Sequence, residues 1–556
     1  MSHSATPSSP LPTARSLTPL SGFWSGGEIT PISAAGPLLA HVAQPAWIVD
    51  DHGVAALATG GQATFGSQTG GASLGALPIR GYIPVCRPEN LGDRAFCDDH
   101  GLSMPYVAGA MANGIASVEL VQAMGRAGML GVFGAAGLSL AVVEKAIDRL
   151  GTRLAGRPWA TNLIHSPYEP AHEEAVVDLY LRRGVSTVSA SAFLGLTLPL
   201  VRFRLSGIGL DSAGHIHTPH KVIGKVSRAE VAEHFLSPAP AELIGELVRR
   251  GDLSETQAEM ARHVPVAQDL VVEADSGGHT DNRPALTLFP GMATLARAKQ
   301  ALYDFAKPLR VGLAGGISTP HAAAGAFAMG AAFVLTGSVN QATLEAGTSD
   351  IVRKMLAQAG QADVKMAPAA DMFEMGVDLQ VLSRGTLFPM RARRLRELYE
   401  AHASLDELPA ADKKRLEGTI LGCSIDEAWA GTASFWADRD PAQLARAESD
   451  PKHKMALLFR WYLGSSSRWA NAGDPARVVD YQVWCGPAMG AFNEWARGSL
   501  FEPWENRRAM PIAHNILWGA SALTRLSALR NQGVPVSVDC LDLTPREPAV
   551  LEELLS

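Results

Sequence analysis

Residues 271–281 read VVEADSGGHTD, and this stretch decides how the rest of the chain is interpreted. An apolar run typical of a buried strand leads directly into a polar turn with two glycines and a histidine. In α/β folds, functional side chains gather at the carboxyl ends of the strands. The turn at residues 275–279 is therefore expected to place a carboxylate, backbone N–H groups and an imidazole at such an end.

Two later stretches repeat this pattern of an apolar strand, small residues and an alanine-rich helical run. They are VGLAGGIST at residues 311–319 and VLTGSVNQ at residues 334–341. Closely spaced glycines expose backbone N–H groups, and the dipole of a following helix adds positive potential, so the loops are suited to a phosphate dianion. One such loop alone is more often a tight turn, whereas two in successive units favour a phosphate site.

Eight strand patterns, most of them followed by a helical pattern, lie between about residues 105 and 337. This alternation predicts an α/β protein with a (β/α)8 TIM barrel. A doubly wound open sheet is the competing architecture, but it calls for a glycine fingerprint after the first strand. Here the glycine loops follow the last three strands, and barrels hold phosphate after strands seven and eight, so the barrel is preferred.

The changes of pattern predict four regions along the chain. They are a flexible tail at 1–20, a small N-terminal cap region at 21–101, the barrel at 102–385 with a helical insert near 238–263, and a helical C-terminal region at 386–556. In the last region only VPVSVDCLDL, residues 534–543, suggests a strand.

Composition excludes several classes of protein. The 556 residues include 48 Lys and Arg against 55 Asp and Glu, and the net charge of −7 argues against bulk attraction to nucleic acid or anionic membrane. Five cysteines without a C-x-x-C pair indicate neither a zinc site nor a disulfide framework. The Ser- and Pro-rich N-terminus lacks the apolar core of a signal peptide, and no apolar window is long enough to span a bilayer, so a cytoplasmic location is expected.

Several side chains have two interpretations. His279 is either a loop histidine bonded to a carbonyl or a group that exchanges a proton near neutral pH. Asn113 and Asn162 follow predicted strands and either bind the edge of a flat heterocycle or stabilise turns. Cys485 is favoured as a buried apolar residue over a nucleophile, because no histidine pattern accompanies it.

Two charged or polar runs are also ambiguous. GHIHTPHK, residues 214–221, has the H-x-H spacing of a metal site but no acidic or thiol partner, so a polar hairpin is favoured. RARRLR, residues 391–396, lies on a predicted helix and is either a solvated charge run or a docking patch for an acidic partner.

The motifs AGAMANG, TNLI, DSGGHT, AGGIST and TGSVNQ, between residues 104 and 341, resemble the barrels of nitronate monooxygenases and flavin enoyl reductases. A narrower resemblance follows from EADSGGHTDNRP, MAPAADMFEMGVDLQVLSRGTLFPMRA, FRWYLG and DYQVWCGPAMGAFN. These stretches look like the trans-acting enoyl reductase family of polyunsaturated fatty acid synthases and trans-acyltransferase polyketide synthases.

The resemblance implies FMN in the barrel mouth, NADPH or NADH as hydride donor, and an enoyl thioester on an acyl carrier protein of a megasynthase as substrate. It implies that His279 is the catalytic residue, polarising the thioester carbonyl or assisting protonation. It assigns no role to Asp275, and a homo-oligomer is compatible with it. The residues it assigns to the cofactor are Ala110, Met111, Ala112, Asn113, Asn162, Lys225, Gly277, Gly278, Ala314, Gly315, Gly316, Gly337 and Ser338.

Two other functions stay open from the sequence. One is a nitronate monooxygenase-like flavin oxidase, although this chain has DSGGH where that wider group has EAGGH, which makes nitronate oxidation less favoured. The other is a non-catalytic megasynthase scaffold, which would dock through its helical C-terminal region.

Overall fold

The computed structural model describes residues 22–65, 75–166 and 169–556. The chain divides into two compact units, one formed by residues 1–91 and 514–556 and the other by residues 92–513. The units separate at residues 91 and 513. The expected flexible tail lies outside the described residues.

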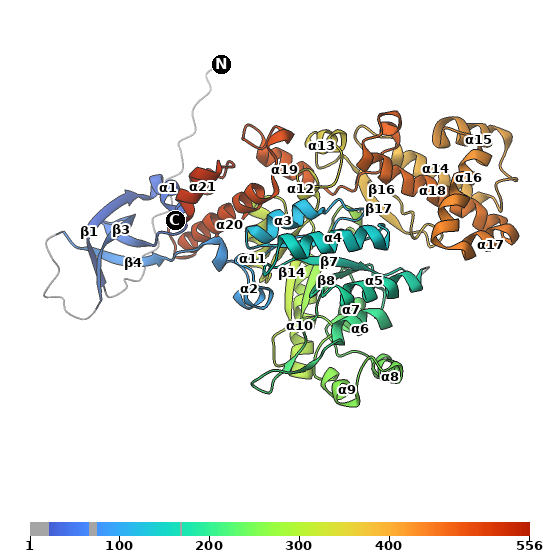
Figure 1. The fold of residues 1–556 in the computed structure, drawn as a ribbon. Coiled ribbons are helices and arrows are strands. Elements are labelled where there is room, and N and C mark those ends of the chain that lie inside the picture. Colours follow the sequence, from blue (N-terminus) through green and yellow to red (C-terminus); the bar gives the residue numbers. More distant parts are fainter. Residues whose placement is uncertain (1–21, 66–74, 167–168) are drawn as a thin grey trace, which may run out of the picture. The chain divides into compact units, whose positions relative to one another are not determined.

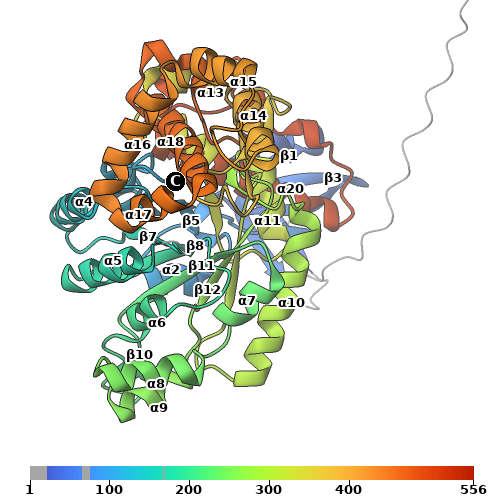
Figure 2. The same cartoon turned by 90° about the vertical axis from the view of Figure 1, so that its right-hand side faces the viewer.

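The larger unit is built on a closed barrel of eight parallel strands, which confirms the predicted (β/α)8 architecture (Figures 1 and 2). The barrel order is β11-β12-β14-β15-β5-β6-β7-β8, so each strand pairs with its neighbour in sequence and the last pairs with the first. The strands are β5 (Tyr106–Ala108), β6 (Leu130–Phe133), β7 (Ala160–Ile164), β8 (Thr187–Ser191), β11 (Lys221–Val226), β12 (Asp269–Glu273), β14 (Arg310–Ala314) and β15 (Val334–Thr336).

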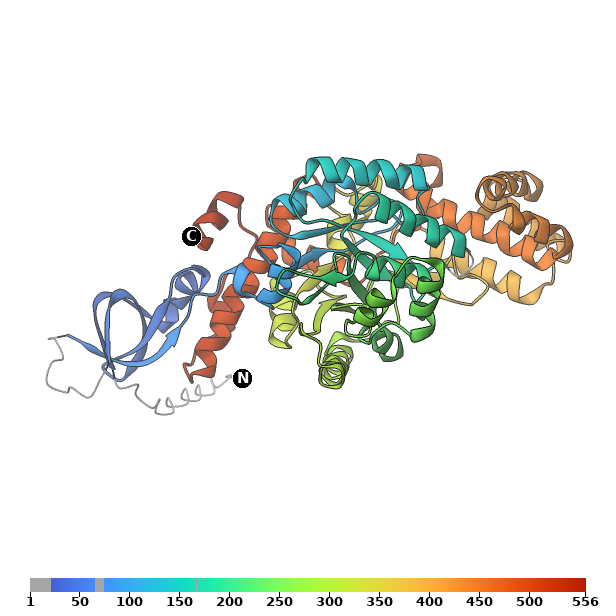
Figure 3. The ribbon, with the colours of Figure 1, turned by 60° about the horizontal axis from the view of Figure 1, so that its bottom comes forward.

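These strands are almost entirely buried, as expected for a parallel sheet that is covered by helices. Figure 3 shows helices around the sheet. They are α3 (Val118–Arg126), α4 (Leu140–Arg153), α5 (Pro170–Arg182), α6 (Leu198–Leu205), α7 (Ala229–Phe235), α10 (Ala285–Tyr303), α11 (Pro320–Ala328) and the short α12 (Ser338–Gln341). Two further helices, α8 (Ala241–Arg250) and α9 (Glu255–Ala261), lie between β11 and β12 where the helical insert was expected.

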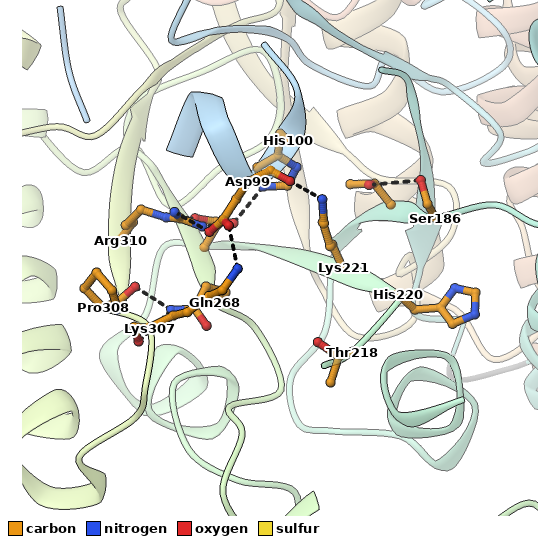
Figure 4. Close-up of polar contacts among 12 residues, drawn as sticks. Asp99, His100, Ser186, Thr218, His220, Lys221, Gln268, Lys307, Pro308 and Arg310 are labelled. Carbon is orange, nitrogen blue, oxygen red and sulfur yellow. Dashed lines mark hydrogen bonds and ion pairs between the residues drawn. The ribbon is translucent and has the colours of Figure 1, made fainter. Parts of the chain in front are cut away.

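The amino ends of the strands are joined by a buried charge network (Figure 4). His100, at the end of α2 (Arg94–His100), lies 2.8 Å from Asp269, which also accepts a 2.6 Å hydrogen bond from Arg310. Arg310 and Lys221 both bind Asp99, one at its carboxylate and one at its carbonyl oxygen. Polar contacts at this end of a barrel serve stability, because chemistry occurs at the opposite end.

Beyond the barrel the chain is helical, but it also holds two strands that the sequence pattern did not reveal. Strands β16 (Val364–Pro368) and β17 (Asp378–Leu382) form a small antiparallel sheet with β13 (Gly278–His279), in the order β13-β17-β16. The glycine-histidine turn at the end of β12 therefore carries a strand of its own.

The helices of this region are α13 (Asp350–Ala357), α14 (Phe388–Ala401), α15 (Ala410–Arg415), a π-helix (Leu416–Leu421), α16 (Ile425–Arg439), α17 (Pro441–Ser449), α18 (Pro451–Ala472) and α19 (Ala488–Ala496), with 3₁₀ turns at Pro475–Asp480 and Trp504–Asn506. Residues of α14, the π-helix, α16 and α18 share an apolar core with the small sheet. In Figure 1, α14, α16 and α18 lie together beside β16 and β17.

The smaller unit is a closed antiparallel barrel in the order β1-β3-β2-β4. Its strands are β1 (Gly22–Pro31), β2 (Ala46–Asp51), β3 (Val54–Phe65) and β4 (Leu77–Ile83), with α1 (Ala35–Ala40) between the first two. Residues of α20 (Ala509–Asn531) and α21 (Pro548–Leu555) complete its core. For example, Trp518 donates a 2.9 Å hydrogen bond to the carbonyl oxygen of Ala40.

The prediction of a strand at residues 534–543 is wrong. This segment instead contains a 3₁₀ turn at Val538–Cys540, capped by the Ser537 side chain, which accepts from the Asp539 N–H. Alternating apolar residues imitate a strand here, but Pro535 has no N–H to donate to a ladder. The apolar side chains Val534 and Val536 pack into the core of the smaller unit instead.

The two ambiguous runs are resolved by their contacts. The histidine run forms the predicted polar hairpin, with β9 (Gly209–Leu210) paired antiparallel to β10 (Ile216–His217). The RARRLR run on α14 is not a free basic patch, because its arginines pair within the chain. Arg391 contacts Asp480, and Arg393, Arg394 and Arg396 contact other nearby carboxylates.

Candidate active site

One cavity of about 1000 Å³ opens at the carboxyl ends of the barrel strands. Every site residue predicted from the sequence lines it, including His279. The cofactor residues predicted from the sequence and found in its wall are Ala110, Met111, Ala112, Asn113, Asn162, Lys225, Gly277, Gly278, Ala314, Gly315, Gly316, Gly337 and Ser338. Loops that are far apart in sequence therefore converge on one space, as the barrel topology requires.

His279 is held by the small sheet and by a carboxylate. Its strand β13 pairs with β17, which places His279 opposite Leu379. Its Nε2 atom lies 3.1 Å from Oδ1 of Asp371, a residue in the loop between β16 and β17. The imidazole side chain is 37% exposed, so the pair faces the cavity and is accessible to a ligand.

The two partners shift each other's pKa in opposite directions. Burial lowers the pKa of His279, but the charge and the hydrogen bond of Asp371 outweigh it, so the pKa of His279 is raised. Burial raises the pKa of Asp371, but the charge and the hydrogen bond of His279 outweigh it, so that pKa is lowered. The pair stabilises the imidazolium form of His279 relative to the neutral imidazole, and the imidazolium is the form that can donate a proton.

The loop that carries Asp371 is fixed by a helix of the C-terminal region. Arg460 of α18 donates a 2.9 Å hydrogen bond from Nε to the carbonyl oxygen of Ala370 and lies 3.3 Å from Glu374. Both anchors lie within three residues of Asp371. The helical region thus contributes to the site by fixing the carboxylate that holds His279.

A second charged pair lies on the barrel wall. Lys225, near the end of β11, donates from Nζ to Oε1 of Glu273 at 2.7 Å. The same oxygen accepts a 3.2 Å hydrogen bond from the hydroxyl of Ser276. Lys225 is therefore a cation paired with Glu273 in the wall of the cavity.

Asp275, which had no predicted role, stabilises the loop that leads to His279. Its Oδ1 accepts a 2.8 Å hydrogen bond from Gln380 and a 3.0 Å hydrogen bond from Asn282. Gln380 also donates to the carbonyl oxygen of Ser276 at 2.8 Å. Because Gln380 lies on β17, these bonds tie the end of β12 to the small sheet.

Two glycines in the wall are required by close backbone approaches. Gly315 has φ +84°, and a Cβ atom on it would lie 2.6 Å from the carbonyl carbon of Ala274. A Cβ on Gly277 would lie 2.7 Å from the backbone nitrogen of Cys485. Because Gly277 has no side chain, the backbone around Cys485 can pack against it in the cavity wall. The sequence did not indicate this packing role.

Both predicted amide side chains border the cavity and also bond to neighbouring loops. Asn162 accepts from the Ala136 N–H at 3.1 Å and donates to Ser191 at 3.3 Å. Asn113 donates to the hydroxyl of Ser467 on α18 at 3.0 Å. Asn162 thus joins β7 to β8 and to the loop after β6. Asn113 joins the barrel to the helical region.

The histidine of a second histidine–carboxylate pair lines the same cavity, and it was not identified from the sequence. His165 follows β7, and its Nδ1 lies 3.0 Å from Glu173, whose other oxygen accepts a hydrogen bond from Thr197. The ring of His165 also stacks on Phe193 at 5.3 Å. Its position in the sequence could have identified it, because His165 follows a predicted barrel strand as directly as the residues that were predicted to line the site.

The wall opposite the barrel is aromatic and comes from the C-terminal region. Phe435 and Trp436 on α16, Trp461 on α18 and Trp484 line the cavity there. Helical aromatic residues are usually core, so the sequence offered no reason to place these at a site. The adjacent Cys485 is fully buried, and burial raises the pKa of its thiol to about 12, which is the expected behaviour of a packing residue.

Residues 22–65, 75–166 and 169–556 hold neither a metal-ligand cluster nor a membrane-spanning helix. These residues contain no group of three or more His, Cys, Asp or Glu side chains arranged to hold a metal ion. None of the helices in the same ranges is both long and apolar enough to cross a bilayer.

Comparisons with known proteins identify relatives of this chain. Residues 402–481 match the family described as acyl-carrier-protein S-malonyltransferase, inserted helical domain. The chain is 47% identical over 456 residues to a polyunsaturated fatty acid synthase component of Thraustochytrium sp., covering 81% of this chain and 30% of that protein. It is 45% identical over 436 residues to polyketide biosynthesis protein PksE of Bacillus subtilis, covering 78% of this chain and 56% of that protein.

A solved structure matches most of the chain. The enoyl reductase domain of MlnA, from the macrolactin biosynthesis cluster of Bacillus amyloliquefaciens, superposes with a TM-score of 0.76 at 37% identity. The alignment covers 79% of this chain and 99% of that chain. This chain therefore belongs to the family of enoyl reductases associated with polyketide synthases and polyunsaturated fatty acid synthases.

Proposed function

We propose that this chain is an FMN-dependent enoyl reductase that acts in trans on enoyl thioesters carried by an acyl carrier protein, with NADPH or NADH as reductant. The observation that carries the proposal is the convergence of the predicted flavin-binding residues and the His279–Asp371 pair on one cavity. Membership of the enoyl reductase family supports the same reaction class.

The cavity suits FMN in size and in the chemistry of its wall. Its volume of about 1000 Å³ is at the upper end of ordinary ligand sites. A Cβ atom added to Gly316 or Gly337 would meet nothing within 4 Å, so the backbone of both proposed phosphate loops faces open space. The exposed N–H groups of such loops suit a phosphate, and Lys225 supplies a cation elsewhere on the wall.

When bound, FMN would supply the hydride chemistry, receiving hydride from NAD(P)H and delivering it to the β-carbon of the enoyl thioester. The remaining steps belong to the protein. Protonated His279 shares its Nε2 proton with Asp371, which leaves its Nδ1 proton for the substrate. That proton either hydrogen-bonds to the thioester carbonyl oxygen or moves to the α-carbon.

The two walls of the cavity have different roles in this proposal. The barrel loops hold the polar cofactor, and the aromatic side chains of Phe435, Trp436 and Trp461 exclude water from the opposite side. An apolar wall also suits the hydrocarbon part of an acyl chain. The substrate would therefore enter between the barrel mouth and helices α16 and α18.

The partners of the chain are proposed from its relatives. These relatives are a component of a polyunsaturated fatty acid synthase and a polyketide biosynthesis protein, and the chain spans 30% and 56% of their lengths. We infer that an acyl carrier protein domain of such a synthase delivers the substrate. The RARRLR run is not part of this proposal, because its arginines already pair with carboxylates of the chain.

The test measures the flavin absorbance of the protein as purified and then its steady-state activity after reconstitution with FMN. We expect flavin absorbance to copurify with the protein, and NADPH oxidation to depend on crotonyl-carrier protein and to yield the saturated thioester by mass spectrometry. Protein that binds no flavin would support a scaffold role. Oxygen-dependent turnover of propyl nitronate, without turnover of the thioester, would support an oxidase. Either result would overturn the proposal.

A further inference from the structure

A short extended segment of the C-terminal region forms part of the cavity wall, and we call residues 481–485 the strap. The strap runs antiparallel to β17, with a bridge between Trp484 and Val381. The N–H of Leu382 donates to the carbonyl oxygen of Val483 at 2.8 Å. The backbone of the strap is therefore fixed by the same strand that positions His279.

The side chains of the strap alternate between the core and the cavity. Tyr481, Val483 and Cys485 are at most 1% exposed and point into the protein. Gln482 and Trp484 line the cavity. This alternation is the ordinary consequence of an extended backbone, and it gives two polar side chains the same orientation.

Both of these side chains carry a buried donor without a partner. The Nε2 atom of Gln482 and the indole Nε1 of Trp484 are shielded from solvent, and neither has a hydrogen-bond acceptor among the described residues. Gln482 is only 4% exposed. An unsatisfied buried donor is costly, and two on one cavity wall indicate a ligand with acceptor atoms at that position.

The position of the strap identifies the ligand. Its Cys485 backbone packs against Gly277 at the end of β12, as the close approach at Gly277 shows. The next residue, Gly486, donates its N–H to the hydroxyl of Ser338 at 3.2 Å. The strap thus connects two of the loops assigned to the flavin, one after β12 and one after β15.

We infer that Gln482 and Trp484 are cofactor-binding residues, whose Nε2–H and Nε1–H groups donate hydrogen bonds to oxygen or nitrogen acceptors of FMN. The inference rests on the proposed function, because it takes FMN as the ligand of the cavity. It assigns to the C-terminal region a direct share in cofactor binding, in addition to holding Asp371. The competing ligand for these donors is the carbonyl oxygen of the enoyl thioester.

Flavin affinity tests the inference without reference to turnover. FMN would be titrated into apo protein, and the dissociation constant read from quenching of flavin fluorescence, for wild type, Q482L, W484F and W461F. Trp461 lines the same cavity from α18, but its indole nitrogen is not among the buried donors that lack a partner, so W461F is the matched control. We expect Q482L and W484F each to weaken FMN binding by about tenfold, and W461F by less than about twofold.

A second measurement serves if a variant fails to fold. In wild-type protein labelled with ¹⁵N in its tryptophans, the indole N–H resonance of Trp484 is expected to move downfield when FMN is added. Unchanged FMN affinity in both folded variants, or an unmoved Trp484 resonance in FMN-saturated protein, would overturn the inference. A rise in the KM for crotonyl-carrier protein with unchanged FMN affinity would also overturn it, because the donors would then bind the substrate.

Wild-type protein separates the failure of this inference from the failure of the proposed function. If wild-type protein binds no FMN, the proposed function fails. If wild-type protein binds FMN and the Q482L and W484F variants bind it equally well, the proposed function stands and only the assignment of the strap fails.

Discussion

The Nε2 atom of His279 lies 3.1 Å from Oδ1 of Asp371, a residue 92 positions further along the chain. The contact exists because β13 pairs with β17, which brings the turn before β17 over the barrel mouth. A barrel loop supplies the imidazole, and the region beyond the barrel supplies the carboxylate. The proposed acid is therefore assembled from both parts of the larger unit.

Substitution D371N is expected to lower the pKa of His279. Burial and the charge of Lys225 both lower that pKa, and Asp371 is the main group that opposes them. Without its carboxylate, the imidazolium form would be lost at lower pH. As pH rises, the kcat for enoyl reduction should therefore begin to fall at a lower pH in D371N than in wild type.

The same pair contributes to stability within a defined pH window. The raised pKa of His279 means that its contribution is lost as pH rises through that folded-state value. The lowered pKa of Asp371 means that its contribution is lost as pH falls through its own folded-state value. An NMR titration of the His279 ring that gives the same pKa in wild type and D371N would contradict the assigned electrostatics.

Substitution H279A is expected to slow the reaction after flavin reduction. A positioned general acid contributes typically about 10² to 10⁴ in rate, so the rate of enoyl-dependent flavin reoxidation should fall by at least about 10²-fold. Flavin reduction by NADPH should change little, because it needs no proton from His279. Stopped-flow traces of both half-reactions separate the two effects, and an unchanged reoxidation rate would remove His279 from the mechanism.

Substitution D269N is expected to destabilise the barrel without altering the site. Asp269 is 2% exposed and bonds to both His100 and Arg310, so its loss leaves the Arg310 charge buried with one partner fewer. Breaking such a pair costs about 3–5 kcal/mol. Urea denaturation measures the change.

The control for D269N is D98N on α2, the helix that also carries His100. Asp98 pairs with Arg94 at 2.8 Å, but its side chain is 60% exposed, so its loss should cost less than about 1 kcal/mol. Equal destabilisation by D98N and D269N would contradict the role of the buried network.

The pKa of Asp269 is lowered, since His100 and Arg310 outweigh the burial that raises it. The contribution of Asp269 to the free energy of unfolding is therefore lost as pH falls through its folded-state pKa.

Substitution G277A is expected to displace the strap. The added Cβ would lie 2.7 Å from the backbone nitrogen of Cys485, and overpacking of this kind typically costs about 1–3 kcal/mol. The control is G245A in α8, where an added Cβ meets nothing within 4 Å and should stabilise the helix by about 0.5–1 kcal/mol. Thermal unfolding of both variants gives the comparison, and a neutral G277A would contradict the close approach.

The barrel and the barrel side of the cavity were predictable because their signals are local in sequence. Each barrel strand is a short apolar run, and the residues that border the cavity lie at its end or follow it directly, as Asn162 lies in β7 and His279 follows β12. Once the fold is a barrel, its topology brings all such positions to one mouth. Asp275 lies in the same stretch, but its loop-stabilising bonds depend on Gln380 and Asn282 and were not evident.

The other side of the cavity was not predictable because it depends on pairing between distant segments. Asp371, Gln482 and Trp484 reach the cavity only through β16, β17 and the strap, which are short and lie among strong helical patterns. Arg460 looks like an ordinary charge on a helix until its contact with the Ala370 carbonyl is seen. The strand predicted at residues 534–543 is wrong for a related reason. The local alternation of apolar residues there resembles a strand, but the segment pairs with no other strand of the described chain.

An anaerobic stopped-flow experiment tests the proposed activity most directly. FMN-reconstituted protein, reduced with one equivalent of NADPH, would be mixed with crotonyl-carrier protein and, separately, with air-saturated buffer, and flavin absorbance would be followed. We predict that the enoyl thioester reoxidises the flavin faster than oxygen does and that the saturated thioester forms in equal amount. A reduced flavin that is reoxidised by oxygen but left unchanged by the enoyl thioester would contradict the assignment of this chain as an enoyl reductase.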